Sequence, residues 1–188
     1  MIHLEESGRE LFGLHSTAST CALRGVIEMR VATSDDWKVW RQLRLAALAD
    51  APYAFTSRLR DWQGSGDREE RWRDRLSLPG SCNLIAVSDG LPVGMVSGFP
   101  GSRVDAVELG TLWVSRAVRG RGVGDRLVQE VQQWATQVGV EVLLLTVASS
   151  NEHAIALYRR NGFDRAEPSA REPLAVGKFT MCKVLRAG

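Results

Sequence analysis

The chain has 188 residues, with 24 basic and 22 acidic side chains and a formal net charge of +2. This length suits one well-buried domain, alone or with a tail. The near-zero charge balance excludes the surface-wide basic field that binds nucleic acids or anionic membranes. Any anionic ligand therefore has to be bound by a local group of positive side chains or backbone N–H groups. No apolar run approaches the ~18–20 residues that cross a bilayer. We therefore expect a globular protein without nucleic-acid or membrane partners.

Residues 1–25 differ from the rest of the chain. They open with acidic residues where a signal peptide is basic, and they lack its apolar stretch of ~7–15 residues. The segment is small and polar, without a helical or strand period. We predict a flexible N-terminal tail over residues 1–25, no secretory signal, and one domain over residues 26–188.

The three cysteines, Cys21, Cys82 and Cys182, are scattered along the chain. They are too few for a disulfide framework, and none has the CxxC spacing of a zinc site. We therefore expect reduced thiols in a cytoplasmic protein and no metal.

From residue 26 onward the pattern indicates alternating strands and helices. Residues 26–31 alternate as a short strand. Residues 33–36 supply caps for a helix that ends before Pro52, and the charged segment 67–76 predicts a second helix. Trp37, Trp40, Trp72 and Trp134 occupy helical-face positions and are expected to pack in the core.

The middle of the chain predicts an antiparallel meander followed by a crossover. Its expected strands are residues 83–88, 92–99 and 106–114. A helical period from residue 123 to 138 follows, and then the apolar run 140–147. Such a run, reached through a helix, predicts a strand that is parallel to 106–114 and buried on both faces. The last expected elements are a helix over 151–162 and strands near 163–167 and 179–185.

The loop Arg119-Gly120-Arg121-Gly122-Val123-Gly124 lies between a predicted strand and a predicted helix. Its three glycines allow several backbone N–H groups to converge on an anion at the positive end of a helix. The two arginines add local positive charge. The loop therefore predicts a pyrophosphate site, with a tight surface turn as the alternative.

Two common nucleotide motifs do not fit this loop. A dinucleotide-binding fold needs a third glycine where this chain has Asp125, and an acid at the end of the next strand, which here reads Thr146-Val147-Ala148. The G-x-x-x-x-G-K-[ST] pattern of a P-loop is absent.

Two motifs resemble those of the GNAT family of N-acetyltransferases. Arg119-x-x-Gly122-x-Gly124 is similar to the family's pyrophosphate pattern Q/R-x-x-G-x-G/A, and Asn151-x-x-Ala154-x-x-Leu157-Tyr158-x-x-x-Gly162-Phe163 is similar to its second motif. They stand in the family's order, separated by one helix and one strand. The resemblance covers residues from about 26 to 186.

The resemblance implies an α/β (α+β) fold with a mixed, mostly antiparallel sheet of six or seven strands flanked by helices. Its parallel fourth and fifth strands would splay apart into an acetyl-CoA cleft. Backbone groups that lose their ladder partners there can bind the pantetheine arm as a missing strand. The residues implied in cofactor binding are Leu112, Trp113, Val114, Arg119, Gly120, Arg121, Gly122, Val123, Gly124, Asp125, Asn151 and Ala154. The Leu112 N–H would also polarise the thioester carbonyl.

Two residues are catalytic candidates. Tyr158 lies about two helical turns beyond Asn151, so both face one side of a helix. Its phenol could protonate the thiolate of departing coenzyme A, and plain aromatic packing is the alternative. Glu108 lies six residues before Val114, and even spacing on a strand puts both on one face. It is the candidate general base, and a solvent-facing carboxylate is the alternative.

The acceptor is not named by these motifs. Tyr53, Phe55 and Trp62, with the loop 168–177, fall where the family builds its acceptor pocket. The resemblance implies direct acetyl transfer from acetyl-CoA to a small-molecule or peptide amine, and it allows a homodimer. The cysteines lack a His-Asp partnership, which argues against a thiol intermediate. The alternatives are a non-catalytic acyl-CoA-binding or regulatory module, another acyl donor, or a hydroxyl acceptor.

Overall fold

The computed structural model describes residues 25–101, 103, 105–167 and 176–185. Apart from Gly25, the predicted tail 1–25 lies outside the described residues. The strands form one sheet in the order β1-β2-β3-β4-β5-β7-β6, with β4 and β5 parallel and the other neighbouring pairs antiparallel. The mixed, mostly antiparallel sheet flanked by helices is therefore confirmed.

The elements follow the predicted order closely. The strands are β1 Ile27–Val31, β2 Cys82–Ser88, β3 Leu91–Pro100, β4 Ala106–Val114, β5 Val142–Ala148, β6 Asp164–Arg165 and β7 Lys178–Val184. The helices are α1 Trp37–Asp50, α2 Glu69–Leu76, α3 Val123–Gln137 and α4 Glu152–Arg160.

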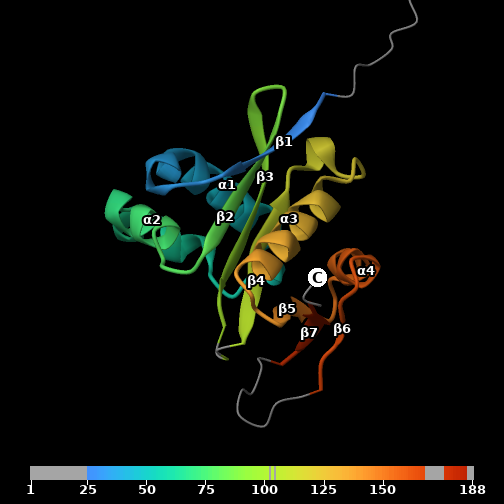
Figure 1. The fold of residues 1–188 in the computed structure, drawn as a ribbon. Helices are drawn as coiled ribbons and strands as arrows, with labels where there is room; N and C mark the ends of the chain where they lie inside the picture. Colours follow the sequence, from blue (N-terminus) through green and yellow to red (C-terminus); the bar gives the residue numbers. More distant parts are fainter. Residues whose placement is uncertain (1–24, 102, 104, 168–175, 186–188) are drawn as a thin grey trace, which may run out of the picture.

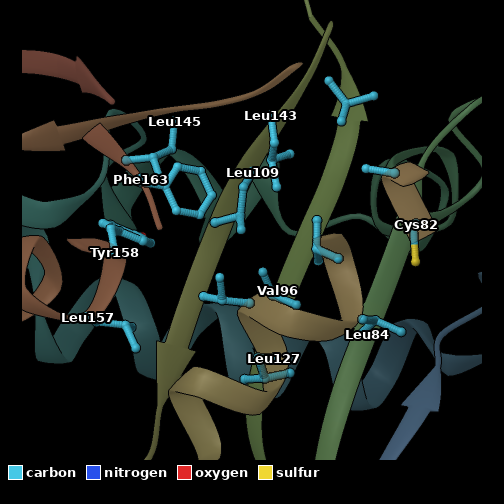
Figure 2. Close-up of a cluster of buried hydrophobic side chains, with 14 of the residues drawn as sticks. Cys82, Leu84, Val96, Leu109, Leu127, Leu143, Leu145, Leu157, Tyr158 and Phe163 are labelled. Carbon is cyan, nitrogen blue, oxygen red and sulfur yellow. The ribbon is translucent and has the colours of Figure 1, made fainter. Parts of the chain in front are cut away.

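The helices cover the two faces of the sheet (Figure 1). One core joins α3 and α4 to the sheet, where Leu127 of α3 and Leu157 of α4 pack with Leu109 (Figure 2). The other core joins α1 and α2 to the sheet through Trp40 and Trp72, both with no exposed surface. The expected packing role of these two tryptophans is confirmed.

The sheet splits between β4 and β5. Only three residue pairs join these strands, from Ala106–Val142 to Glu108–Leu144. β4 nevertheless continues to Val114 along β3, and β5 continues to Ala148 along β7. The predicted splay is therefore confirmed, and the separated ends leave backbone groups without a ladder partner between the two strands.

A β-bulge interrupts β4 at Thr111, which has a φ of 60°. Before the bulge, Leu109 packs in the α3/α4 core; after it, Val114 packs against that same core and Trp113 against the α1/α2 core. Because the bulge shifts the alternation by one residue, Glu108 faces the α1/α2 side. The prediction that Glu108 and Val114 share a face is therefore wrong.

The burial of β5 also differs from the prediction. Leu143, Leu145 and Val147 are buried, whereas Leu144 is half-buried and Thr146 is exposed. The strand is thus fully buried on one face only. Its apolar sequence does not reveal this difference, because the splay opens the other face toward the cleft.

Candidate active site

A cavity of about 970 Å³ occupies the splay between β4 and β5. Its walls come from the end of α1, the turn Pro52–Ala54 and the residues after it, β4, the glycine loop, the start of α3, β5, and α4. The predicted residues that line it are Leu112, Trp113, Val114, Arg119, Gly120, Gly122, Val123, Gly124, Asp125, Asn151, Ala154 and Tyr158. Glu108 and Arg121 are not among the lining residues.

The glycine loop presents its backbone to this cavity. Gly120 and Gly122 adopt φ values of 77° and 78°, which L side chains rarely reach, and open space lies where a Cβ would stand. The first helical bond of α3 runs from the Arg126 N–H to the Gly122 carbonyl, 3.1 Å away. The amides of the preceding helical turn therefore have no helical acceptor and can bind an anion.

Asp50, at the end of α1, organises the arginines beside this loop. Its carboxylate accepts hydrogen bonds from Trp113 Nε1, 3.0 Å away, and from Arg116 and Arg119. The Trp113 bond, followed by those from the arginines, lowers the pKa of Asp50 to about 2. Arg119 also donates through Nε to the Val114 carbonyl at 2.9 Å, so it joins the end of β4 to α1.

Sequence reasoning missed Asp50. It lies more than 60 residues before its partners in the chain, and an aspartate at the end of a helix carries no local signal for such a contact.

Arg121 takes a different direction from the other loop arginines. Its guanidinium donates to the Gly25 carbonyl at 3.1 Å, next to β1, and its backbone N–H donates to the Val118 carbonyl at 3.4 Å. The structure therefore does not bring Arg121 to the cavity with Arg116 and Arg119.

The start of α3 is tied to the end of α4. Asp125 pairs with Arg160 and accepts from Asn161 Nδ2 at 2.9 Å, and the Arg160 bond comes first among the causes that lower the pKa of Asp125. A Cβ on Gly124 would stand 3.3 Å from Leu157 Cδ2. Gly124 thus lets the two helices approach closely.

Tyr158 lies on the cavity wall in a nearly dry environment. Its side chain is 8% exposed and meets Phe163 edge-on, with ring centroids 5.8 Å apart (Figure 2). Burial raises the pKa of this phenol above its ordinary value, so it keeps its proton at neutral pH. Asn151 caps the same helix, because its Oδ1 accepts from the Ala154 N–H at 3.2 Å.

Glu108 lies beyond the edge of the cavity on the α1/α2 side. It is half-buried and pairs in the sheet with Phe99 and Leu144. The next residue on its face of β4, Gly110, does line the cavity. Glu108 therefore lies two residues along β4 from Gly110, the nearest lining residue on its face of the strand.

The expected acceptor residues divide into two groups. Tyr53 and Phe55 line the cavity. Trp62 packs against Trp72 instead, with ring centroids 4.5 Å apart, and it belongs to the α1/α2 core. Of the loop 168–177, residues 168–175 lie outside the described residues.

The described residues contain neither a candidate metal cluster nor a candidate membrane span. No group of three His, Cys, Asp or Glu side chains is placed to hold a metal ion there. No helix in that part of the chain has both the length and the apolar character to span a membrane.

The fold matches those of solved acetyltransferases. A model of the acetyltransferase (GNAT) family matches residues 43–163. The chain therefore belongs to the GNAT acetyltransferase family.

Curated relatives resemble parts of the chain. N-acetyltransferase 8 of Homo sapiens is 31% identical over 107 residues, which are 55% of this chain and 47% of the relative. L-2,4-diaminobutyric acid acetyltransferase of Nocardia farcinica is 27% identical over 144 residues, which are 74% of this chain and 65% of the relative. The chain thus spans less than two thirds of the length of each.

Solved structures share the fold over about 85% of the chain. PaiA N-acetyltransferase from Thermoplasma acidophilum, in complex with coenzyme A, has a TM-score of 0.68 at 18% identity and covers 85% of this chain and 99% of its own. A GNAT-family acetyltransferase from Streptococcus pneumoniae has a TM-score of 0.67 at 20% identity, with coverages of 86% and 100%. At these identities the likeness establishes the fold alone.

Proposed function

We propose that the protein is an acetyl-CoA-dependent N-acetyltransferase that passes the acetyl group directly to an amine bound in the same cleft. The observation that carries the proposal is the splayed pair β4–β5, whose gap holds the cavity of about 970 Å³ and ends at the glycine loop. Among the relatives, one name specifies diaminobutyric acid and one structural neighbour is a spermidine N-acetyltransferase chimera. The relatives therefore support an amine acceptor without agreeing on which one.

The residues present fit acetyl-CoA. The backbone of Leu112 and Val114 borders the gap, where an amide-rich pantetheine arm can replace the missing ladder partners. The amides of Gly120 and of Gly122 to Asp125, together with the positive end of α3, suit a pyrophosphate. When bound, acetyl-CoA supplies an activated acyl group with a thiolate as its leaving group.

Tyr158 is the proton donor in this proposal. Its hydroxyl group holds a proton at neutral pH, because burial disfavours the phenolate. A thiol ordinarily has a pKa of about 8.5, below that of the buried phenol, so Tyr158 would first donate a hydrogen bond to the sulfur as it leaves. The phenolate formed when the proton passes to the sulfur would be reprotonated by the proton that the amine releases. The Leu112 N–H, beside the Thr111 bulge, is the candidate donor to the thioester carbonyl.

Glu108 is the candidate base on the acceptor side. The bulge turns it toward the α1/α2 face, where Tyr53 and Phe55 line the cavity. An amine with a pKa of about 10 has to lose a proton before it attacks a carbonyl. Since Glu108 lies two residues along β4 from the lining residue Gly110, a water molecule would relay the proton to its carboxylate.

Binding and turnover measured together test the proposed function. Calorimetry with acetyl-CoA, palmitoyl-CoA and free coenzyme A would give the donor affinities, and thiol release with a panel of amines and alcohols would report transfer. We expect saturable acetyl-CoA binding and acetyl transfer to at least one amine. Saturable binding without turnover of any acceptor would instead favour a regulatory acyl-CoA-binding module, and preference for palmitoyl-CoA or an alcohol would redefine the donor or the acceptor.

A further inference from the structure

On the α1/α2 side of the sheet, the buried Arg44 and the half-buried Arg75 both have buried donor atoms without a hydrogen-bond partner. Arg44 of α1 is 4% exposed, and it makes no ion pair or hydrogen bond with another described residue. Arg75 of α2 donates from Nη2 to Thr111 Oγ1 at 3.1 Å. Buried guanidinium groups are ordinarily paired, because desolvating an unpaired charge is costly.

All the buried side-chain atoms that lack a hydrogen-bond partner in the described part of the chain are donors. They are Trp40 Nε1, Arg44 Nε, Arg44 Nη1 and Arg75 Nε. They come from α1 and α2, which cover the same face of the sheet. Nearby Asp67 does not satisfy them, because its carboxylate binds Arg41 and Trp72 Nε1.

Neither guanidinium group lines the cavity, but each contacts a residue that does. The Arg44 Cζ lies 4.5 Å from the centroid of the Phe55 ring, and Phe55 lines the cavity. Arg75 holds the hydroxyl oxygen of Thr111, another lining residue, so the Thr111 O–H is left to donate elsewhere. Thr111 is the bulge residue directly before Leu112, the candidate thioester-binding position.

Burial, and then the positive charges of neighbouring arginines, lower the pKa values of the arginines in this region. Burial, and then the charge of Arg75, lowers the pKa of Arg44 to about 10. Burial, and then Arg71, lowers the pKa of Arg75. Both groups stay protonated at neutral pH, so positive charge lies directly behind Phe55 and Thr111, while Glu108 faces the same side of β4.

We propose that the acceptor is an amine that carries a carboxylate, of the amino-acid class. The Thr111 O–H, oriented by Arg75, would donate to this carboxylate, and the charges of Arg44 and Arg75 behind the Phe55–Thr111 wall would stabilise it. The inference rests on the proposed function. It assigns the carboxylate to the arginine end and the amino group to the end nearer Glu108. A polyamine without an anion would be repelled by the like charges of Arg44 and Arg75 behind this wall, so it fits the site poorly.

Matched acceptor pairs test the inference. The twenty standard amino acids, their α-carboxamides and a linear diamine would be compared by kcat/KM at saturating acetyl-CoA. We expect at least one amino acid to exceed its amide by about tenfold or more. Equal use of acids and amides would overturn the inference but leave the proposed function standing, whereas no turnover of any amine would count against the proposed function itself.

Substitutions at the arginines sharpen the test. Arg44→Met and Arg75→Met should each lower kcat/KM for the acid by about 30-fold or more, with little change for the amide. Acetyl-CoA affinity should stay unchanged. Lys38→Met removes an exposed charge from the same helix as Arg44 and should change neither acceptor. Equal losses for acid and amide would contradict the assignment.

Stability gives a second readout that a purely structural role would not reproduce. An unpaired buried charge destabilises the unliganded protein, so Arg44→Met should not lower its melting temperature and should raise it by about 2–4 °C per kcal/mol recovered. Arg44→Lys keeps the charge and should retain part of the preference for the acid. A lower melting temperature for Arg44→Met, with loss of both acceptors, would mark Arg44 as structural and overturn the inference.

Discussion

The two sides of the cleft differ in which part of the chain meets the ligand. On the α3/α4 side, the glycine loop and the open edge of β4 present backbone groups, and Gly120 and Gly122 leave space beside them. On the α1/α2 side, the wall is built from side chains such as Phe55, with Arg44 and Arg75 behind it. Backbone recognition suits a cofactor shared by a family, whereas side-chain recognition lets the acceptor change by substitution.

The largest expected effect is on kcat, at Tyr158 on the α3/α4 side of the cleft. Tyr158→Phe should lower kcat by about 10²–10³-fold, in the range of general acid catalysis, with acetyl-CoA affinity unchanged. Tyr53 is the other tyrosine of the chain and also lines the cavity, but it is 59% exposed. Tyr53→Phe is therefore the matched control and should retain kcat. Wild-type kcat in Tyr158→Phe would remove the proton-donor assignment.

A second substitution tests whether the acceptor side also carries the base. Glu108→Gln should lower kcat/KM at neutral pH by about 10–100-fold and flatten the acidic limb of the pH–rate profile. Glu28→Gln makes the same change at an exposed position of β1 and serves as the control. A pH–rate profile for Glu108→Gln that coincides with that of the wild type would leave Glu108 a sheet residue without a catalytic role.

A smaller effect on kinetics is expected at Asp50, which joins the end of α1 to the end of β4 and the arginines beside the glycine loop. Asp50→Asn weakens the contacts of Asp50 with Trp113, Arg116 and Arg119, so the KM for acetyl-CoA should rise by about tenfold. Asp74→Asn removes an exposed carboxylate from α2 and is the control. An unchanged KM in Asp50→Asn would show that the cofactor loop is positioned without α1.

The pH dependence of stability tests the same carboxylate. The pKa of Asp50 is about 2 in the folded protein, below the ordinary value of about 3.9 expected when unfolded. Its stabilising contribution is therefore complete above pH 5 and is lost as the pH falls from about 4 to 2. The difference in melting temperature between wild type and Asp50→Asn should shrink over that interval, and a constant difference would contradict the assignment.

The sequence predicts the α3/α4 side of the cleft better than the α1/α2 side, for physical reasons. Gly120 and Gly122 are local signals, because a positive φ at a strand-to-helix turn requires glycine. The bulge at Thr111 has no such signal, since threonine is ordinary in a strand and the shift depends on pairing with β3. A single shift of alternation was enough to reverse the predicted face of Glu108.

Contacts between distant segments account for the other differences. Asp50 meets Arg116 and Arg119 only after folding, and Arg121 turns toward Gly25 rather than the cavity. Arg44 lies in a helix whose charge pattern resembles an ordinary solvated face, yet it is buried. These positions depend on tertiary packing, which no local pattern in the sequence contains.

Hydrogen exchange with and without acetyl-CoA tests the central claim most directly. The claim is that acetyl-CoA fills the gap between β4 and β5 and lies against the glycine loop. We predict that added acetyl-CoA slows amide exchange in peptides that cover residues 109–114 and 119–125, with no change in α2. Saturable binding that leaves both of those segments unprotected would contradict the account.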